Sequence, residues 1–188
     1  MNLPNKLTVV RIVLTPFFLA AMLLKLNYNI NYLIAAVIFI AASVTDFLDG
    51  RIARKNGIVT TFGKLCDPLA DKMLTTAALL AFMQLGVCNI WIVMTVLTRE
   101  FLITSFRLVA AAQGVVIAAG KAGKLKTASQ MIFSIIIMFL LFFADILDIE
   151  QETVSLISNI LLGITAALAV ISGVKYIIDG KKVIDFSK

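Results

Sequence analysis

The sequence predicts an all-helical integral membrane protein in which residues 1–188 form a single domain. Hydrophobic residues make up 61% of the chain and the mean hydropathy is +1.01, whereas an ordinary soluble domain has about 45–50% apolar residues. The apolar residues also fall into six runs close to the length of about 20 residues that crosses a bilayer. These runs occupy most of the chain and leave no room for a soluble domain.

The six runs are separated by short connections, so we expect six transmembrane helices. Residues 2–8 come before the first run and are expected to form a short N-terminal interfacial segment. Pro16 is expected to bend or adjust the first helix. The expected spans are Val9–Leu26, Tyr32–Leu48, Cys66–Leu85, Ile90–Ala112, Thr127–Ala144 and Val154–Ile178.

The charges between the spans predict the orientation. Basic residues gather before the first span, in the second and fourth connections and in the C-terminal tail, whereas the third connection is uncharged and the fifth is acidic. The positive-inside rule places the basic side in the cytoplasm. Both termini are therefore expected to be cytoplasmic, in the plasma membrane or inner membrane of a cell. The net charge of +6 is interpreted as membrane orientation, and no nucleic acid is expected as a partner.

The chain contains no histidine. Phosphohistidine intermediates, nucleophiles activated by histidine and histidine-ligated zinc are therefore excluded. Cys66 and Cys88 are too few for a disulfide framework and are expected to be reduced. Any proton chemistry must then depend on carboxylates, lysines or metal ions.

Chemistry-bearing side chains concentrate between Asp46 and Asp71. Asp46 and Asp49 are three residues apart and Asp67 and Asp71 are four apart, so each pair shares one face of its helix. Four clustered carboxylates would repel one another without bound cations, and oxygen ligands favour Mg²⁺, Mn²⁺ or Ca²⁺ over zinc. The alternatives are solvated aspartates in a cytoplasmic loop or proton-relay groups of a small ion or solute transporter.

Small residues and one arginine accompany these aspartates. Gly50 and Ala53 keep the helix face short, and Gly63 allows a second close approach one turn before Asp67. Arg54 offers a fork of donors that suits phosphate. The segment therefore suits a ligand that carries phosphate.

These residues match every fixed position of Asp-x2-Asp-Gly-x2-Ala-Arg-x8-Gly-x3-Asp-x3-Asp, and the segment resembles the signature of the CDP-alcohol phosphotransferases. The resemblance implies a membrane enzyme, and a homodimer, that transfers a phosphatidyl or similar group from a CDP-activated donor to an alcohol and releases CMP. It further implies that the four aspartates hold two divalent ions, Mg²⁺ or Mn²⁺, with Asp71 as general base. The CDP site would be lined by Gly50, Ala53, Arg54 and Gly63.

The fourth span contains Arg99 and Arg107, and an arginine inside a span is by default functional and partnered. Glu100 is adjacent to Arg99, but neighbouring helical residues point in different directions, so a partner on another helix and a ligand are both open for Arg99. Arg107 could form a basic pocket for a phosphorylated acceptor with Lys72, Lys121, Lys124 and Lys126. The lysines could alternatively be plain positive-inside charges.

Longer stretches resemble the phosphatidylglycerophosphate synthase branch of the same family: NLPNKLTVVRIVLTPFF, CDPLADKMLTTAALL, TREFLITSFRL and AGKLKTASQM. This resemblance implies CDP-diacylglycerol as donor and glycerol-3-phosphate as acceptor, with membrane lipids around the helices. Inositol phosphate, serine or another alcohol is the alternative acceptor. The implied contacts of the acceptor phosphate are Thr8, Arg11, Arg107, Lys124 and Lys126.

Overall fold

The structure is a computed structural model that describes residues 3–24, 29–56, 61–114 and 120–181, with side chains described except at 3–6, 46–56, 61–69 and 71. This part of the chain contains six helices and no strand, which confirms the all-helical class. The helices are α1 (Leu3–Leu23), α2 (Ile30–Asn56), α3 (Thr61–Gln84), α4 (Ile90–Ala112), α5 (Lys121–Ile146) and α6 (Gln151–Gly180).

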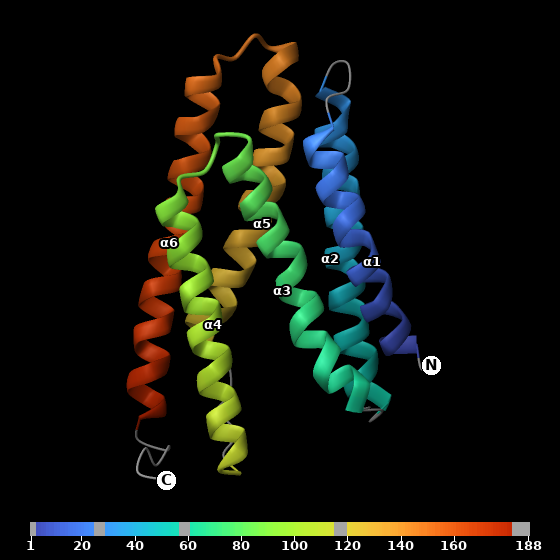
Figure 1. Cartoon of the computed structure of the whole chain (residues 1–188), viewed down its shortest axis with the longest axis vertical. Coiled ribbons are helices and arrows are strands. Elements are labelled where there is room, and N and C mark those ends of the chain that lie inside the picture. Colours follow the sequence, from blue (N-terminus) through green and yellow to red (C-terminus); the bar gives the residue numbers. More distant parts are fainter. Residues whose placement is uncertain (1–2, 25–28, 57–60, 115–119, 182–188) are drawn as a thin grey trace.

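The helices run up and down along one long axis (Figure 1). Helices α1, α3 and α5 start, and α2, α4 and α6 finish, towards the same end of the bundle, which we call the lower end. Helix α1 packs on α2 and α3, α4 packs on α6, and α5 packs on α2 and α6. The two halves of the aspartate signature, in α2 and α3, are therefore brought to the lower end, where α1 starts and α6 finishes.

Several helices begin before, or end after, the apolar runs that predicted them. Residues 3–8 belong to α1, so the segment expected at the membrane interface is continuous with the first helix. Pro4 is in the first helical turn, where the missing N–H costs little, and α1 continues through Pro16. Helix α2 likewise extends past Leu48 to Asn56. A polar residue ends an apolar run, but a helix continues through polar residues as long as its backbone hydrogen bonds continue.

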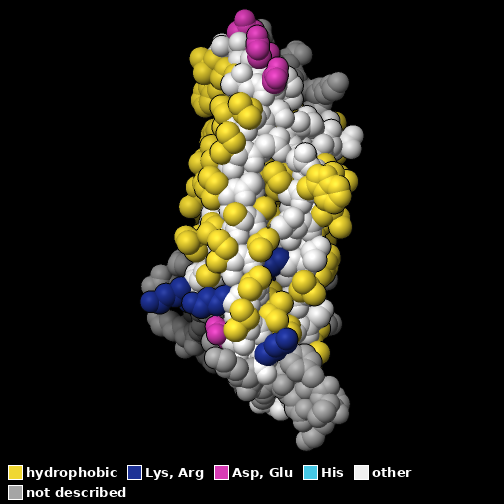
Figure 2. All heavy atoms as spheres, turned by 90° about the vertical axis from the view of Figure 1, so that its left-hand side faces the viewer, with side chains coloured by type: hydrophobic (Ala, Val, Ile, Leu, Met, Phe, Trp, Pro, Cys, Tyr) yellow, Lys and Arg dark blue, Asp and Glu magenta, His cyan; other side chains and the backbone are white. Residues whose placement is uncertain are grey.

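The apolar residues are distributed over the outer surface as well as the core. Within the described residues, α5 and α6 are each long and apolar enough to cross a membrane, and α1 and α2 contain shorter apolar segments, Leu7–Leu23 and Ile30–Thr45. Figure 2 shows apolar side chains along most of the visible face. Outward-facing examples on α6 are Ile164, Val170, Ile171 and Val174.

Charge is divided between the two ends of the bundle (Figure 2). The upper end has exposed acidic side chains where α5 leads into α6, at Asp145, Asp148, Glu150 and Glu152. Most of the basic side chains on the visible face lie towards the lower end. The described residues thus have the separation of acidic and basic ends from which the orientation in the membrane was predicted.

Aromatic and small residues make the core. Phe18 of α1 and Phe39 of α2 are fully buried, and their rings pack with centroids 5.5 Å apart. Buried alanines on α2 and α3 allow close approach of neighbouring backbones; they include Ala35, Ala36, Ala42, Ala77, Ala78 and Ala81. Cys88 is a free thiol as expected, and burial raises its pKa to about 12. The side chain of Cys66 lies outside the described residues.

Replacement of Phe39 by alanine tests this core. Phe39→Ala leaves a cavity beside Phe18 and should destabilise the protein by about 3 kcal/mol, which thermal unfolding in detergent would measure. Val37→Ala is the control, because Val37 is 59% exposed on the same helix. Equal unfolding midpoints for the two variants would contradict the described packing.

Candidate functional site

A cavity of about 720 Å³ lies towards the lower end of the bundle, with lining residues from α2, α3, α4, α5 and α6. Polar and charged side chains dominate the lining that the structure describes. Two of these residues are acidic, Glu100 and Asp179, and six are basic: Lys72, Arg99, Arg107, Lys121, Lys124 and Lys175. We call it the basic cavity, and its charge suits an anionic ligand.

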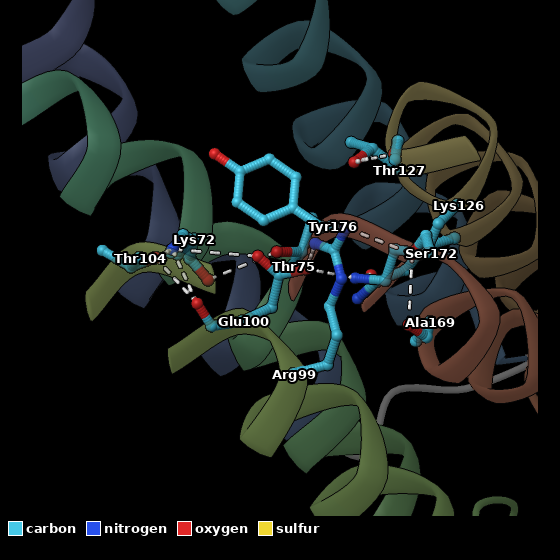
Figure 3. A network of polar contacts seen from close by, with 12 residues as sticks. Lys72, Thr75, Arg99, Glu100, Thr104, Lys126, Thr127, Ala169, Ser172 and Tyr176 are labelled. Atoms are coloured by element: carbon cyan, nitrogen blue, oxygen red, sulfur yellow. Dashed lines mark hydrogen bonds and ion pairs between the residues drawn. The ribbon is translucent and has the colours of Figure 1, made fainter. Parts of the chain in front are cut away.

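Glu100 is the centre of a network of charged contacts (Figure 3). Its Oε1 accepts from Lys126 Nζ at 2.6 Å and from Arg99 Nη1 at 3.0 Å. Lys72 Nζ lies 3.8 Å from Oε2 and donates to the Glu100 backbone carbonyl at 3.2 Å and to the Thr104 hydroxyl. One carboxylate therefore holds cations from α3, α4 and α5.

Arg99 connects this network to α6. Its Nη2 donates to Ser172 Oγ at 3.1 Å. A Cβ at Gly173 would lie 3.2 Å from Arg99 Cγ, and one at Gly123 would lie 3.3 Å from Arg99 Nη2. Glycine at both positions gives the arginine room to lie between α5 and α6. The partner of Arg99, open from the sequence, is therefore its neighbour Glu100 together with Ser172.

Lys126 lies behind the cavity wall. Its side chain is only 2% exposed, and its ammonium group donates to Glu100 Oε1 and to Gln130 Oε1, both at 2.6 Å. Lys126 is not among the described residues that line the basic cavity. It would have to exchange a protein partner for a phosphate oxygen to make the predicted contact.

Arg107 is at the outer part of the cavity. Its Nε donates to the Tyr176 hydroxyl at 3.1 Å, and its guanidinium carbon lies 5.3 Å from the centroid of the Tyr176 ring. The side chain is otherwise exposed, as are Lys121 and Lys124. The structure therefore brings Arg107, Lys72, Lys121 and Lys124 of the predicted pocket together around one space.

Thr8 and Arg11 occupy a different position. Both are buried on α1, and Arg11 Nε donates to the backbone carbonyl of Ala42 on α2 at 3.4 Å. Neither is among the described residues that line the basic cavity. The structure therefore does not place Thr8 and Arg11 beside the cations that line this cavity.

The side chains of Asp46, Asp49, Asp67 and Asp71 lie outside the described residues. So do those of the residues expected around CDP: Gly50, Ala53, Arg54 and Gly63. Their backbones belong to α2 and α3, which are continuous over these positions. Among the side chains that are described, no three histidine, cysteine or acidic residues group closely enough to hold a metal ion.

Sequence reasoning missed several polar residues of the site. Ser172, Tyr176 and Asp179 all come from α6, whose sequence was interpreted as an apolar span without discriminating residues. Ser172 and Tyr176 are four residues apart and so share a helix face. The polar face that these residues form on an otherwise apolar helix is the sequence pattern that could have predicted them.

The structure thus combines a helical bundle with a basic cavity that suits an anionic ligand, at the end that contains the aspartate signature. The chain belongs to the CDP-alcohol phosphatidyltransferase family, whose model matches residues 1–172. It is therefore a phosphatidyltransferase.

Three relatives are each named CDP-diacylglycerol–glycerol-3-phosphate 3-phosphatidyltransferase. The protein of Bacillus subtilis is 44% identical over 141 residues, covering 70% of this chain and 73% of the relative. That of Rickettsia typhi is 34% identical over 181 residues, covering 93% and 94%. That of Pseudomonas fluorescens is 35% identical over 144 residues, covering 73% and 72%.

Removal of the Lys126 ammonium group tests the network. Lys126→Met leaves Gln130 Oε1 and part of the Glu100 carboxylate without a buried donor, which should destabilise the protein by about 1–3 kcal/mol. Thermal unfolding without substrates would measure this loss. Lys124→Met is the matched control, since Lys124 is exposed on the same helix and should have little effect; two equally stable variants would refute the assigned contacts.

Proposed function

We propose that this enzyme transfers the phosphatidyl group of CDP-diacylglycerol to glycerol-3-phosphate, which gives phosphatidylglycerophosphate and CMP. The basic cavity is the observation that carries the proposal, because six basic and two acidic side chains line it. A phosphate monoester needs several charged donors to replace its water, whereas a neutral acceptor such as serine does not. The names of the relatives support the same reaction.

We assign the acceptor phosphate to the exposed cations of the cavity. Arg107, which Tyr176 holds through its Nε, and Lys124 both line the cavity with exposed side chains, which makes them the first two contacts. Lys126 would join by exchanging Gln130 for a phosphate oxygen. Thr8 and Arg11 are proposed as contacts from α1.

The four signature aspartates fit two divalent ions, Mg²⁺ or Mn²⁺. The donor set is purely carboxylate, and the chain has no histidine, so hard cations with oxygen ligands suit it. When bound, such ions neutralise diphosphate charge and stabilise the leaving CMP. The residues proposed to hold them are Asp46, Asp49, Asp67 and Asp71, with Gly50, Ala53, Arg54 and Gly63 along the CDP moiety.

The chemical step is a direct substitution at the β-phosphorus of the donor. The cavity cations hold the acceptor phosphate so that a hydroxyl of glycerol-3-phosphate faces the donor. Asp71 removes the proton of that hydroxyl, and the oxygen forms a bond to the β-phosphorus. The bond between this phosphorus and the bridging oxygen breaks, and CMP leaves with the electron pair. No covalent enzyme intermediate is formed.

We propose that six helices span the membrane, with both termini and the basic cavity on the cytoplasmic side. The charge difference between the two ends supports this orientation. An apolar cavity of about 380 Å³ between α4 and α6, lined by residues such as Leu102 and Val174, shares Arg99 with the basic cavity. It supports lateral access for a lipid whose tails stay in the bilayer. A homodimer is part of the same proposal.

An acceptor panel tests the function. The purified enzyme, supplied with CDP-diacylglycerol and Mg²⁺ or Mn²⁺, should release CMP rapidly with glycerol-3-phosphate. The rate should fall by at least about 100-fold with glycerol or serine, since these acceptors lack the group that the cavity binds. Preference for inositol phosphate or for a neutral alcohol would contradict the assignment.

Replacement of the proposed base tests the mechanism. Asp71→Asn cannot accept the hydroxyl proton, so kcat should fall by at least about 1000-fold, while CDP-diacylglycerol still binds. Asp46→Asn is the comparison and should weaken donor and metal binding together. Turnover by Asp71→Asn close to that of the wild type would remove Asp71 from the role of base.

A further inference from the structure

We propose that Glu100 is a positioning residue for the acceptor phosphate. Its carboxylate fixes where Lys72, Arg99 and Lys126 lie beside the basic cavity and thereby sets the affinity for glycerol-3-phosphate. The inference rests on the proposed function, but it concerns a residue outside the aspartate signature and outside the proposed phosphate contacts.

The contacts of Glu100 come from three directions. Its Oε1 is shared by Lys126 of α5 at 2.6 Å and Arg99 at 3.0 Å, and its Oε2 faces Lys72 of α3 at 3.8 Å. Like charges that converge in this way would separate without the carboxylate between them. The three cations therefore share one carboxylate as a counter-ion, and a displacement of that carboxylate would shift all three.

Burial makes this dependence strong. The side chains of Lys126, Arg99 and Glu100 are 2%, 12% and 21% exposed, so water cannot easily take over the role of the carboxylate. Lys72 and Arg99 also line the basic cavity. A displaced carboxylate would therefore change the shape and charge distribution of the surface that meets the acceptor.

A variant of Asp179 can distinguish a positioning role of Glu100 from an effect of its negative charge alone. Asp179 is the second acidic residue among the described lining of the cavity, it is exposed on α6, and the described residues offer it no ion-pair partner. Loss of its charge makes the cavity more positive but leaves the network around Glu100 intact. If Glu100 acted only through its charge, its removal would change the KM for glycerol-3-phosphate in the same direction as removal of Asp179.

Three variants test the proposal, with KM for each substrate, kcat and the unfolding midpoint as readouts. Glu100→Asp keeps the charge but withdraws the carboxylate by one methylene, so the KM for glycerol-3-phosphate should rise roughly tenfold. Glu100→Gln should raise it as well, although the cavity gains positive charge. Asp179→Asn should lower this KM, because the cavity loses a negative charge while the network stays intact. The KM for CDP-diacylglycerol should stay within about twofold throughout.

Three outcomes would overturn the positioning role of Glu100. A wild-type KM for glycerol-3-phosphate in Glu100→Asp, or a lowered KM in Glu100→Gln, would show that only charge matters and would overturn the proposal. A parallel rise in both KM values would also overturn it, since that reports a general structural loss. Wild-type turnover with glycerol-3-phosphate is measured first, so a failure of the proposed function is recognised separately.

Discussion

The site depends on one carboxylate that holds three cations in a poorly hydrated part of a helical bundle. Glu100 lies between the ammonium group of Lys126 and the guanidinium group of Arg99, and loss of its negative charge would be costly at this low exposure. The network also joins α3, α4 and α5 at the level of the basic cavity. It therefore connects the stability of the bundle to the shape of the surface that meets the ligand.

The Glu100 network and the aspartate signature both lie towards the lower end of the bundle because of how the helices pack. Buried alanines bring α2 and α3 close to their neighbours, and both helices contain signature aspartates towards the lower end. Gly123 and Gly173 leave room for Arg99 between α5 and α6. The same face of α6 supplies Ser172 and Tyr176, which orient Arg99 and Arg107. Apolar outer surfaces then suit a lipid donor, and the basic cavity suits a water-soluble anionic acceptor.

The sequence predicted the all-helical class, the six helices and the family, because apolar run length and the spacing of the aspartates are local properties. It predicted the basic pocket from residue type and membrane side. It could not predict the partner of Arg99, since that contact depends on two glycines of other helices and on the reach of a long side chain. It also placed Lys126 with the ligand contacts, whereas burial against Gln130 is a property of the packed bundle.

The central claim is that the basic cavity recognises the phosphate of the acceptor. Equilibrium binding of glycerol-3-phosphate and of glycerol to the purified protein, measured by calorimetry at low and high salt, tests it most directly. The account predicts binding of glycerol-3-phosphate that weakens as salt screens the cavity, and no measurable binding of glycerol. Equal binding of the two ligands, or binding of glycerol-3-phosphate that is insensitive to salt, would contradict it.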